Sequence, residues 1–272
     1  MSAAPTAELD ELAKEAFRVF GLHIEPAKYG VVTSRLPKLL SETSCASLPE
    51  VVAMLRSGAD QRRILAAFDV LSTNHTHFLR EAHHLDLLEQ EFYGPGSTVS
   101  QTPLRIWSAG CSNGCEPYSI AITAAEALKS MNPLGFRMLA TDLSISELRW
   151  AKRGSYTRHH LDSMPSDLVE RYFTPESGPE GELFAVRSEL RAPIRFALLN
   201  LLESWPMKGP FDAIFCRNVL IYFDQPTRDK IVSRFMALLR PGGLLFLGTS
   251  EGISGRFPQL DSIGPSAYRR IA

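Results

Sequence analysis

The first ninety residues carry the hydrophobic pattern of amphipathic helices. Apolar residues recur at steps of three and four between Leu9 and Phe20, and Gly21 follows them. Further along, Ser47 is a suitable N-cap at the start of another apolar run. The pattern predicts four helices, over residues 6–20, 27–40, 47–55 and 61–70. We therefore expect an N-terminal all-helical domain over residues 1–90.

From Leu104 onward, short apolar runs alternate with helical patterns. This alternation predicts an α/β domain with a parallel sheet and helices on both faces. Strands are expected near residues 104–109, 136–141, 194–198, 211–216, 244–247 and 267–271, with helices over 118–128 and 226–239 and a turn at 241–243. The glycine- and proline-rich run after Phe92 predicts a linker over residues 91–103 before a domain over 104–272.

One segment, residues 173–193, is not needed by the alternating pattern. Its first half is rich in turn residues, and apolar and polar residues then alternate from Leu183 to Ser188, which predicts a small antiparallel β appendage. An exposed strand edge can accept an extended peptide, and Gly178 and Gly181 would let its backbone come close. A structural hairpin that binds nothing is an equally open interpretation.

Composition limits the classes of function. The chain is 44% hydrophobic and 22% charged with a net charge of −1, which is typical of a globular protein and predicts no nucleic-acid binding. We expect a cytoplasmic protein without membrane insertion, because no apolar run or signal pattern is present and the four cysteines are scattered. No metal site is expected: Cys111 and Cys115 lack a second pair, and His75, His77 and His83 lack ligand spacing.

Candidate chemistry begins in the loop after residue 109, which contains Gly110 and Gly114 and is followed by Pro117 at the start of a helical pattern. Such a loop lets a ligand approach the backbone and the free N–H groups of a helix N-terminus. Its spacing fits neither the dinucleotide fingerprint nor the phosphate-binding loop. Glu116 would repel a phosphate and suits a cationic ligand such as S-adenosylmethionine (AdoMet), although a plain structural turn remains open.

Polar residues also follow three other predicted strands. In α/β sheets, ligands bind outside the carboxyl ends of the strands, where Asp142, Asn200 and Arg217 are expected. A carboxylate at the position of Asp142 can accept hydrogen bonds from ribose hydroxyls. It can equally serve as the cap of a helix that begins near Ser144.

Four segments together resemble the CheR family of chemotaxis-receptor methyltransferases, over nearly the whole chain. They are Thr-Asn-His-Thr-His-Phe-Leu-Arg-Glu at 73–81, Trp-Ser-Ala-Gly-Cys-Ser-Asn-Gly-Cys-Glu-Pro-Tyr-Ser at 107–119, Ala-Thr-Asp-Leu-Ser at 140–144 and Phe-Cys-Arg-Asn-Val-Leu-Ile-Tyr-Phe at 215–223. One departure is Cys115, which stands where the family usually has the first of two acidic residues. Glu116 keeps the second.

The resemblance implies a Rossmann-like AdoMet methyltransferase domain behind the helical domain. The implied reaction forms glutamyl methyl esters on the cytoplasmic helices of chemoreceptors during chemosensory adaptation, with S-adenosylhomocysteine as product and no metal. Arg80 and Tyr222 are similar to residues near the transferred methyl group. With Gly110 from the loop, the residues expected around AdoMet are Asn74, Thr76, Arg80, Gly110, Glu116, Asp142, Asn200, Leu201, Arg217 and Asn218.

This chemistry suits those side chains. A glutamate has a pKa of about 4.3, so it is ionised at neutral pH and needs no general base to attack a methyl group. Orientation alone can lower the barrier by several kcal/mol. The guanidinium of Arg80 can hold the carboxylate, and Tyr222 can donate one hydrogen bond.

Two other functions remain as alternatives. A methyltransferase for RNA or a small molecule would share the α/β half, but an RNA enzyme would normally have a basic surface. A non-catalytic relative would be expected to lack Arg80 or Tyr222.

Partners are predicted from two features. Lys28, Arg35 and Lys38 are expected on the second helix, either as a docking surface for acidic receptor helices or as a solvated face. Some family members hold a receptor C-terminal tail at the β appendage, around Gly178 and Gly181 here. We expect a monomer, and the sequence does not identify the receptor.

Overall fold

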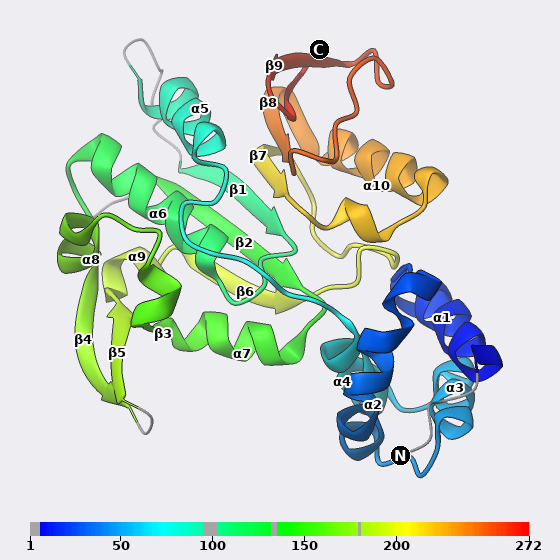
Figure 1. Ribbon diagram of the computed structural model, residues 1–272. Coiled ribbons are helices and arrows are strands. Elements are labelled where there is room, and N and C mark those ends of the chain that lie inside the picture. Colours follow the sequence, from blue (N-terminus) through cyan, green and yellow to red (C-terminus); the bar gives the residue numbers. More distant parts are fainter. Residues whose placement is uncertain (1–5, 95–102, 132–134, 179–180, 272) are drawn as a thin grey trace.

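The computed structural model describes residues 6–94, 103–131, 135–178 and 181–271. In it, a bundle of helices lies beside an α/β unit (Figure 1). The bundle consists of α1 (Thr6–Phe20), η1 (Pro26–Lys28), α2 (Tyr29–Thr43), α3 (Leu48–Ser57) and α4 (Gln61–Leu71). All four predicted helices are confirmed, with small differences at their ends. The prediction that Lys28 lies on the second helix is wrong, because Lys28 lies in η1.

The bundle is held together by the apolar stripe of each helix. Leu9, Leu12, Ala16 and Phe20 of α1 are buried, as their spacing requires. The N-terminus of α4 is capped by Asp60, whose carboxylate accepts hydrogen bonds from two backbone amides at 3.1 and 3.2 Å. In the described part of the chain, no helix is long and apolar enough to cross a membrane.

The main sheet has seven strands in the order β6-β2-β1-β7-β8-β10-β9. They are β1 (Leu104–Ala109), β2 (Phe136–Asp142), β6 (Ile194–Leu198), β7 (Phe211–Cys216), β8 (Leu239–Leu247), β9 (Leu260–Gly264) and β10 (Ala267–Arg270). The first five are parallel, and β10 is antiparallel to both its neighbours. The turn predicted at 241–243 is wrong, because these residues lie within β8. Pairing with β7 shifts register between Phe211 and Ala213, which accommodates the extra residues.

Both faces of the sheet are covered. Ile106 and Phe215 point into a core shared with α5 (Ala82–Tyr93) and α6 (Cys115–Leu128). Trp107 and Ile214 point to the opposite face, into a core shared with α10 (Gln225–Leu238). This alternation is the period of two expected of strands, and it confirms helices on both faces.

A second, three-stranded antiparallel sheet has the order β3-β5-β4. It consists of β3 (Ser155–Thr157), β4 (Phe173–Gly178) and β5 (Gly181–Val186), with η2 (Arg158–Leu161), α8 (Ser166–Tyr172) and α9 (Ser188–Arg191) around it. The predicted antiparallel appendage is confirmed, but as a separate sheet. The sequence predicted turns in the first half of the appendage, but this half forms the strand β4. It pairs with β5 along its length, with Pro175 opposite Phe184.

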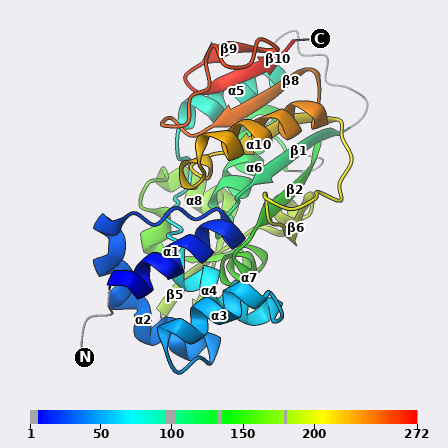
Figure 2. The same ribbon diagram turned by 90° about the vertical axis from the view of Figure 1, so that its right-hand side faces the viewer.

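The buried residues of the bundle end at Leu71. Phe78 and the apolar residues of α5 belong to the core of the main sheet, and α5 packs on α6. The packing therefore favours a boundary between residues 72 and 77, and the division at residue 90 remains a prediction. Most of the expected linker, residues 95–102, lies outside the described residues. The bundle contacts the α/β unit where α4 packs on α7 (Ile145–Arg153), as the perpendicular view shows (Figure 2).

Candidate functional site

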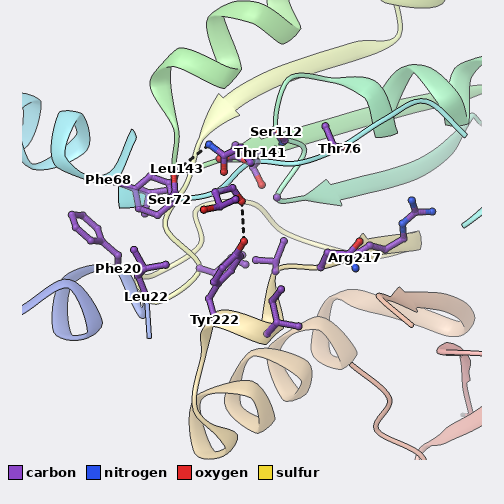
Figure 3. A pocket seen from close by; sticks show the side chains of 18 of the residues that line it. Phe20, Leu22, Phe68, Ser72, Thr76, Ser112, Thr141, Leu143, Arg217 and Tyr222 are labelled. Carbon is purple, nitrogen blue, oxygen red and sulfur yellow. Dashed lines mark hydrogen bonds between the residues drawn. The ribbon is translucent and has the colours of Figure 1, made fainter. Parts of the chain in front are cut away.

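A cavity of about 300 Å³ lies where the bundle meets the carboxyl ends of the central strands (Figure 3). The bundle contributes Phe20, Leu22 and Phe68 to its wall. The connection between the bundle and α5 contributes residues 72–76 and Arg80. Every residue predicted to surround AdoMet lines this one cavity, namely Asn74, Thr76, Arg80, Gly110, Glu116, Asp142, Asn200, Leu201, Arg217 and Asn218, and Tyr222 lines it as well.

The loop after β1 needs its glycines. Gly110 has φ +91°, and a Cβ atom there would lie 2.3 Å from Cγ2 of Val219. The amides of Gly110 and Cys111 both donate to the carbonyl of Thr141, at 2.8 and 2.9 Å, so the loop is tied to the end of β2. Helix α6 begins at Cys115, two residues before the proline that was expected to open it. The backbone therefore runs directly along the cavity wall.

Asp142 organises two backbone segments at once. Its Oδ2 accepts from the amide of Ser112 at 2.8 Å, and its Oδ1 accepts from the amide of Ser144 at 2.9 Å. The helix cap proper is Ser144, whose hydroxyl accepts from the amide of Glu147, so Asp142 is not the cap. Burial raises the pKa of Asp142, and hydrogen bonds from the backbone amides of Ser144, Ser112 and Leu143 counteract this. Each carboxylate oxygen keeps a lone pair for a further donor.

Glu116 and Arg217 form a buried ion pair at the cavity. Oε2 of Glu116 lies 3.0 Å from Nε of Arg217, and the two residues are 9% and 7% exposed. The hydroxyl of Ser108 donates to the other oxygen of Glu116 at 2.7 Å. Burial raises the pKa of Glu116, while the positive charge of Arg217 lowers it. The preference of Glu116 for a cationic ligand stays a prediction, and Arg217 adds a positive charge beside it that the sequence did not reveal.

Arg217 also holds the segment that carries Arg80. Its Nη2 donates to the carbonyl of Arg80 at 2.6 Å, and its Nε lies 3.7 Å from Glu81. Glu81 in turn accepts from the amide of Thr249 at 3.2 Å and lies 3.4 Å from Nδ1 of His84. Although burial raises the pKa of Glu81, its contacts with His84, Thr249 and Arg217 lower it to about 2. Sequence reasoning missed Glu81, even though it closes the 73–81 motif.

Arg80 and Tyr222 both line this cavity. The guanidinium of Arg80 donates to the carbonyl of His75 at 2.9 Å. The hydroxyl of Tyr222, on η3 (Leu220–Tyr222), donates to the carbonyl of Thr73 at 2.9 Å (Figure 3). Burial and the negative charge of Glu251 raise the pKa of Tyr222, and the positive charge of Arg80 lowers it. The two side chains are therefore within electrostatic reach of each other.

Glu251 is a second residue that sequence reasoning missed. It is 3% exposed, and its Oε2 accepts from the amides of Asn218 and Gly248 at 2.8 and 2.6 Å. Its Oε1 accepts from the amide of Ile221 at 2.9 Å. This carboxylate therefore fixes the loop between Arg217 and Tyr222. The available signal was its place just beyond β8, at the same carboxyl edge as Asp142.

The bundle is hydrogen-bonded to the α/β unit around the cavity. The side-chain Nδ2 of Asn200 donates to the carbonyl of Val19 at 3.2 Å, and its Oδ1 accepts from the backbone amide of Leu202 at 3.0 Å. The amide of His23 donates to the carbonyl of Tyr222 at 3.1 Å. These bonds close the cavity on the side of the bundle.

The residues predicted to dock partners are not brought together in one surface. Lys28 and Lys38 are exposed, whereas the guanidinium of Arg35 donates to backbone carbonyls of its own chain. Docking of a partner at these residues stays a prediction. In the β4–β5 hairpin, a Cβ atom at Gly178 would lie 2.5 Å from Cδ1 of Leu183. Gly181 has φ +127°. The geometry of the hairpin itself therefore favours glycine at both positions, whether or not a peptide binds.

The remaining candidates for metal chemistry do not converge. All four cysteines are free and buried. Within the described ranges, no group of three His, Cys, Asp or Glu side chains is arranged to hold a metal ion.

Comparison with known proteins gives a consistent result. Residues 74–267 match the family model described as CheR methyltransferase, SAM binding domain. "Chemotaxis protein methyltransferase 2" of Pseudomonas aeruginosa is 37% identical over 262 residues, which covers 96% of this chain and 92% of that protein. The "Chemotaxis protein methyltransferase" of Salmonella typhimurium is 37% identical and covers 91% and 84% of the two chains. That of Escherichia coli is 37% identical and covers 93% and 86%.

Proposed function

Because the chain belongs to the CheR family of AdoMet-dependent methyltransferases, we propose that its cavity binds AdoMet and that it methylates glutamate side chains of chemoreceptors. One observation carries this proposal. Residues from six stretches of the sequence, between residues 20 and 223, line a single cavity at the carboxyl edge of the sheet. Parallel α/β sheets bind their ligands at that edge.

The side chains of the cavity fit the parts of AdoMet. Asp142 has unused lone pairs for the ribose hydroxyls. Gly110 lines the cavity, and its lack of a Cβ atom lets Val219 pack against the loop. Phe20, Leu22 and Phe68 offer an apolar wall for the adenine. The paired charges of Glu116 and Arg217 match the zwitterionic amino-acid end of the molecule.

When bound, AdoMet supplies an electrophilic methyl group. The substrate carboxylate is ionised at neutral pH, so the protein has only to align it and exclude water. Arg80 and Tyr222 both line the cavity, where Arg80 positions the carboxylate through its planar fork and Tyr222 limits its angle of approach. Arg80 is also bonded to the carbonyl of His75, and we expect it to position the substrate carboxylate more than to neutralise it.

The substrate proposed is a cytoplasmic helix of a chemoreceptor, which places the enzyme in the cytoplasm. The relatives' names, all chemotaxis methyltransferases, support this class. Lys28 and Lys38 are exposed on the bundle and remain candidates for contact with acidic helices. A monomeric state and the absence of metal and nucleic acid remain expectations.

The test of function is transfer of tritiated methyl from AdoMet to a receptor cytoplasmic fragment. We expect label that is released by mild alkali, because glutamyl methyl esters hydrolyse there and N-methyl groups do not. A fragment whose candidate glutamates are replaced by glutamine is the matched control and should stay unlabelled. Alkali-stable label, or label on RNA but not on the fragment, would contradict the proposal.

A receptor tail is proposed as a second contact, at the outer edge of β4. In the described sheet this edge has no neighbouring strand, so its backbone groups are available to an added strand. Calorimetric titration of a receptor-tail peptide tests this, with a peptide N-methylated at alternate amides as control. Gly178→Val is unsuitable as a control, because its side chain would collide with Leu183. Equal binding of both peptides, or of neither, would remove the tail from the account.

A further inference from the structure

We propose that Arg35 is a positioning residue of the cofactor cavity, which it shapes by holding the C-terminus of α4, and that it does not dock the receptor by its charge. The proposal rests on the AdoMet site proposed above. Arg35 lies on α2 and lines no part of the cavity itself.

The guanidinium of Arg35 is bonded to the end of α4. Its Nη1 donates to the carbonyls of Val70, Leu71 and Ser72, at 3.1, 3.2 and 2.9 Å. Its Nη2 lies 3.4 Å from the hydroxyl of Thr73. The last carbonyls of a helix lack partners within the helix, and a cation there also interacts favourably with the helix dipole. Arg35 therefore supplies, from a neighbouring helix, donors for the carbonyls at the C-terminal end of α4.

The capped residues lead directly into the cavity wall. Ser72 and Thr73 line the cavity together with Asn74, whose side-chain Nδ2 donates to the Ser72 hydroxyl at 3.2 Å. The carbonyl of Thr73 accepts from the hydroxyl of Tyr222 at 2.9 Å. A continuous set of hydrogen bonds thus runs from Arg35 through residues 72 and 73 to Tyr222. Holding α4 fixes both the wall of the cavity and the orientation of that phenol.

The geometry requires a guanidinium and not merely a positive charge. A planar fork can donate to several carbonyls that fan out from a helix end, whereas an ammonium is a compact point charge on a flexible stem. Docking by long-range charge, in contrast, would be served nearly as well by lysine. Arg35→Lys therefore separates the two roles, and it retains the charge and most of the stem, which keeps the bundle folded.

The experiment compares Arg35→Lys, Arg35→Ala and the control Lys38→Ala in the full chain. Lys38 lies on the same helix and is exposed, and the structure records no ion pair for it among the described residues. Calorimetry with S-adenosylhomocysteine, without receptor, measures the cavity alone. If residues 72–74 adopt the binding geometry about a tenth of the time without their clamp, affinity falls about tenfold in both Arg35 variants. Lys38→Ala should bind as the wild type does.

Steady-state kinetics distinguishes a positioning role of Arg35 from a role in stability alone, because only the first changes KM for AdoMet selectively. KM for AdoMet should rise in Arg35→Lys, while KM for the receptor fragment and its salt dependence stay unchanged. Hydrogen exchange of residues 72–79 should become faster in the same variant, with global exchange retained.

The inference is overturned if Arg35→Lys binds S-adenosylhomocysteine as the wild type does. It is also overturned if only KM for the receptor rises and the defect shrinks with salt, or if Tm falls while affinity and both KM values hold. Should Arg35→Ala fail to fold, Arg35→Lys decides the matter. Wild-type protein that binds no S-adenosylhomocysteine would instead contradict the proposed function, so the two failures are distinguishable.

Discussion

Replacing Glu251 by glutamine should destabilise the protein and weaken cofactor binding together. In the wild type, three backbone amides donate to this carboxylate, two to Oε2 and one to Oε1. A glutamine can keep its carbonyl oxygen toward Asn218 and Gly248. Its amide group then faces the amide of Ile221, so two donors oppose each other in a buried site.

The expected cost follows from these contacts. Leaving one buried amide unpaired costs about 1–3 kcal/mol, and the two remaining bonds lose their charge assistance, about 1 kcal/mol more in all. For a chain of this size, a loss of about 2–4 kcal/mol lowers Tm by roughly 4–15 °C. The loop from Arg217 to Tyr222 is released at the same time, so affinity for S-adenosylhomocysteine should fall as well.

Thermal unfolding followed by circular dichroism, together with calorimetric titration, measures both effects. Glu170→Gln on α8 is the matched control, because Glu170 is exposed and far from the cavity in the fold. A Glu251→Gln variant with the Tm and the affinity of the control would refute the role of Glu251 as the anchor of this loop.

Three further predictions follow from the site and its surroundings. Tyr222→Phe deletes one hydroxyl and keeps the ring, so turnover should fall while Tm and affinity for S-adenosylhomocysteine hold; full turnover would return Tyr222 to a packing role. The folded-state pKa of Glu81, about 2, lies below the ordinary 4.5. Its carboxylate therefore contributes fully to the free energy of unfolding above pH 4.5, and this contribution is lost as the pH falls through about 2. Urea unfolding of Glu81→Gln should therefore differ most from wild type above pH 4.5 and converge with it toward pH 2; a constant difference would argue against the ionised form. Reversing Lys28 and Lys38 to glutamate should raise KM for the receptor fragment at low salt and less so at high salt, and indifference to both reversals would make these lysines a solvated face.

Periodicity predicted most of the fold, because long apolar stripes and buried parallel strands leave strong patterns. The helices of the bundle and the five parallel strands were found in this way. β4 was missed because its Thr-Pro-Glu-Ser-Gly run has the composition of a turn, and its strand conformation depends on pairing with β5. β9 was missed because it lies at a sheet edge, where none of its residues is buried, and it shows no apolar alternation.

The lining of the cavity was predictable, but its internal bonding was not. Strand ends identified Asp142, Asn200 and Arg217, because topology brings carboxyl ends to one edge. The pairing of Glu116 with Arg217 joins residues about a hundred positions apart, and no sequence pattern indicates it. The same is true of Arg35, whose charge was visible but whose partners, 35 to 38 residues away, were not.

The central claim is that the cavity at the carboxyl edge is the AdoMet site, and calorimetric titration of S-adenosylhomocysteine into wild-type protein and Asp142→Ala tests it most directly. Wild type should bind one equivalent, and the variant should bind about 1.5–3 kcal/mol more weakly, because charge-assisted hydrogen bonds to the ribose are lost. Circular dichroism of both proteins ensures that the variant is folded. Wild type without binding, or a folded variant with unchanged affinity, would contradict the account.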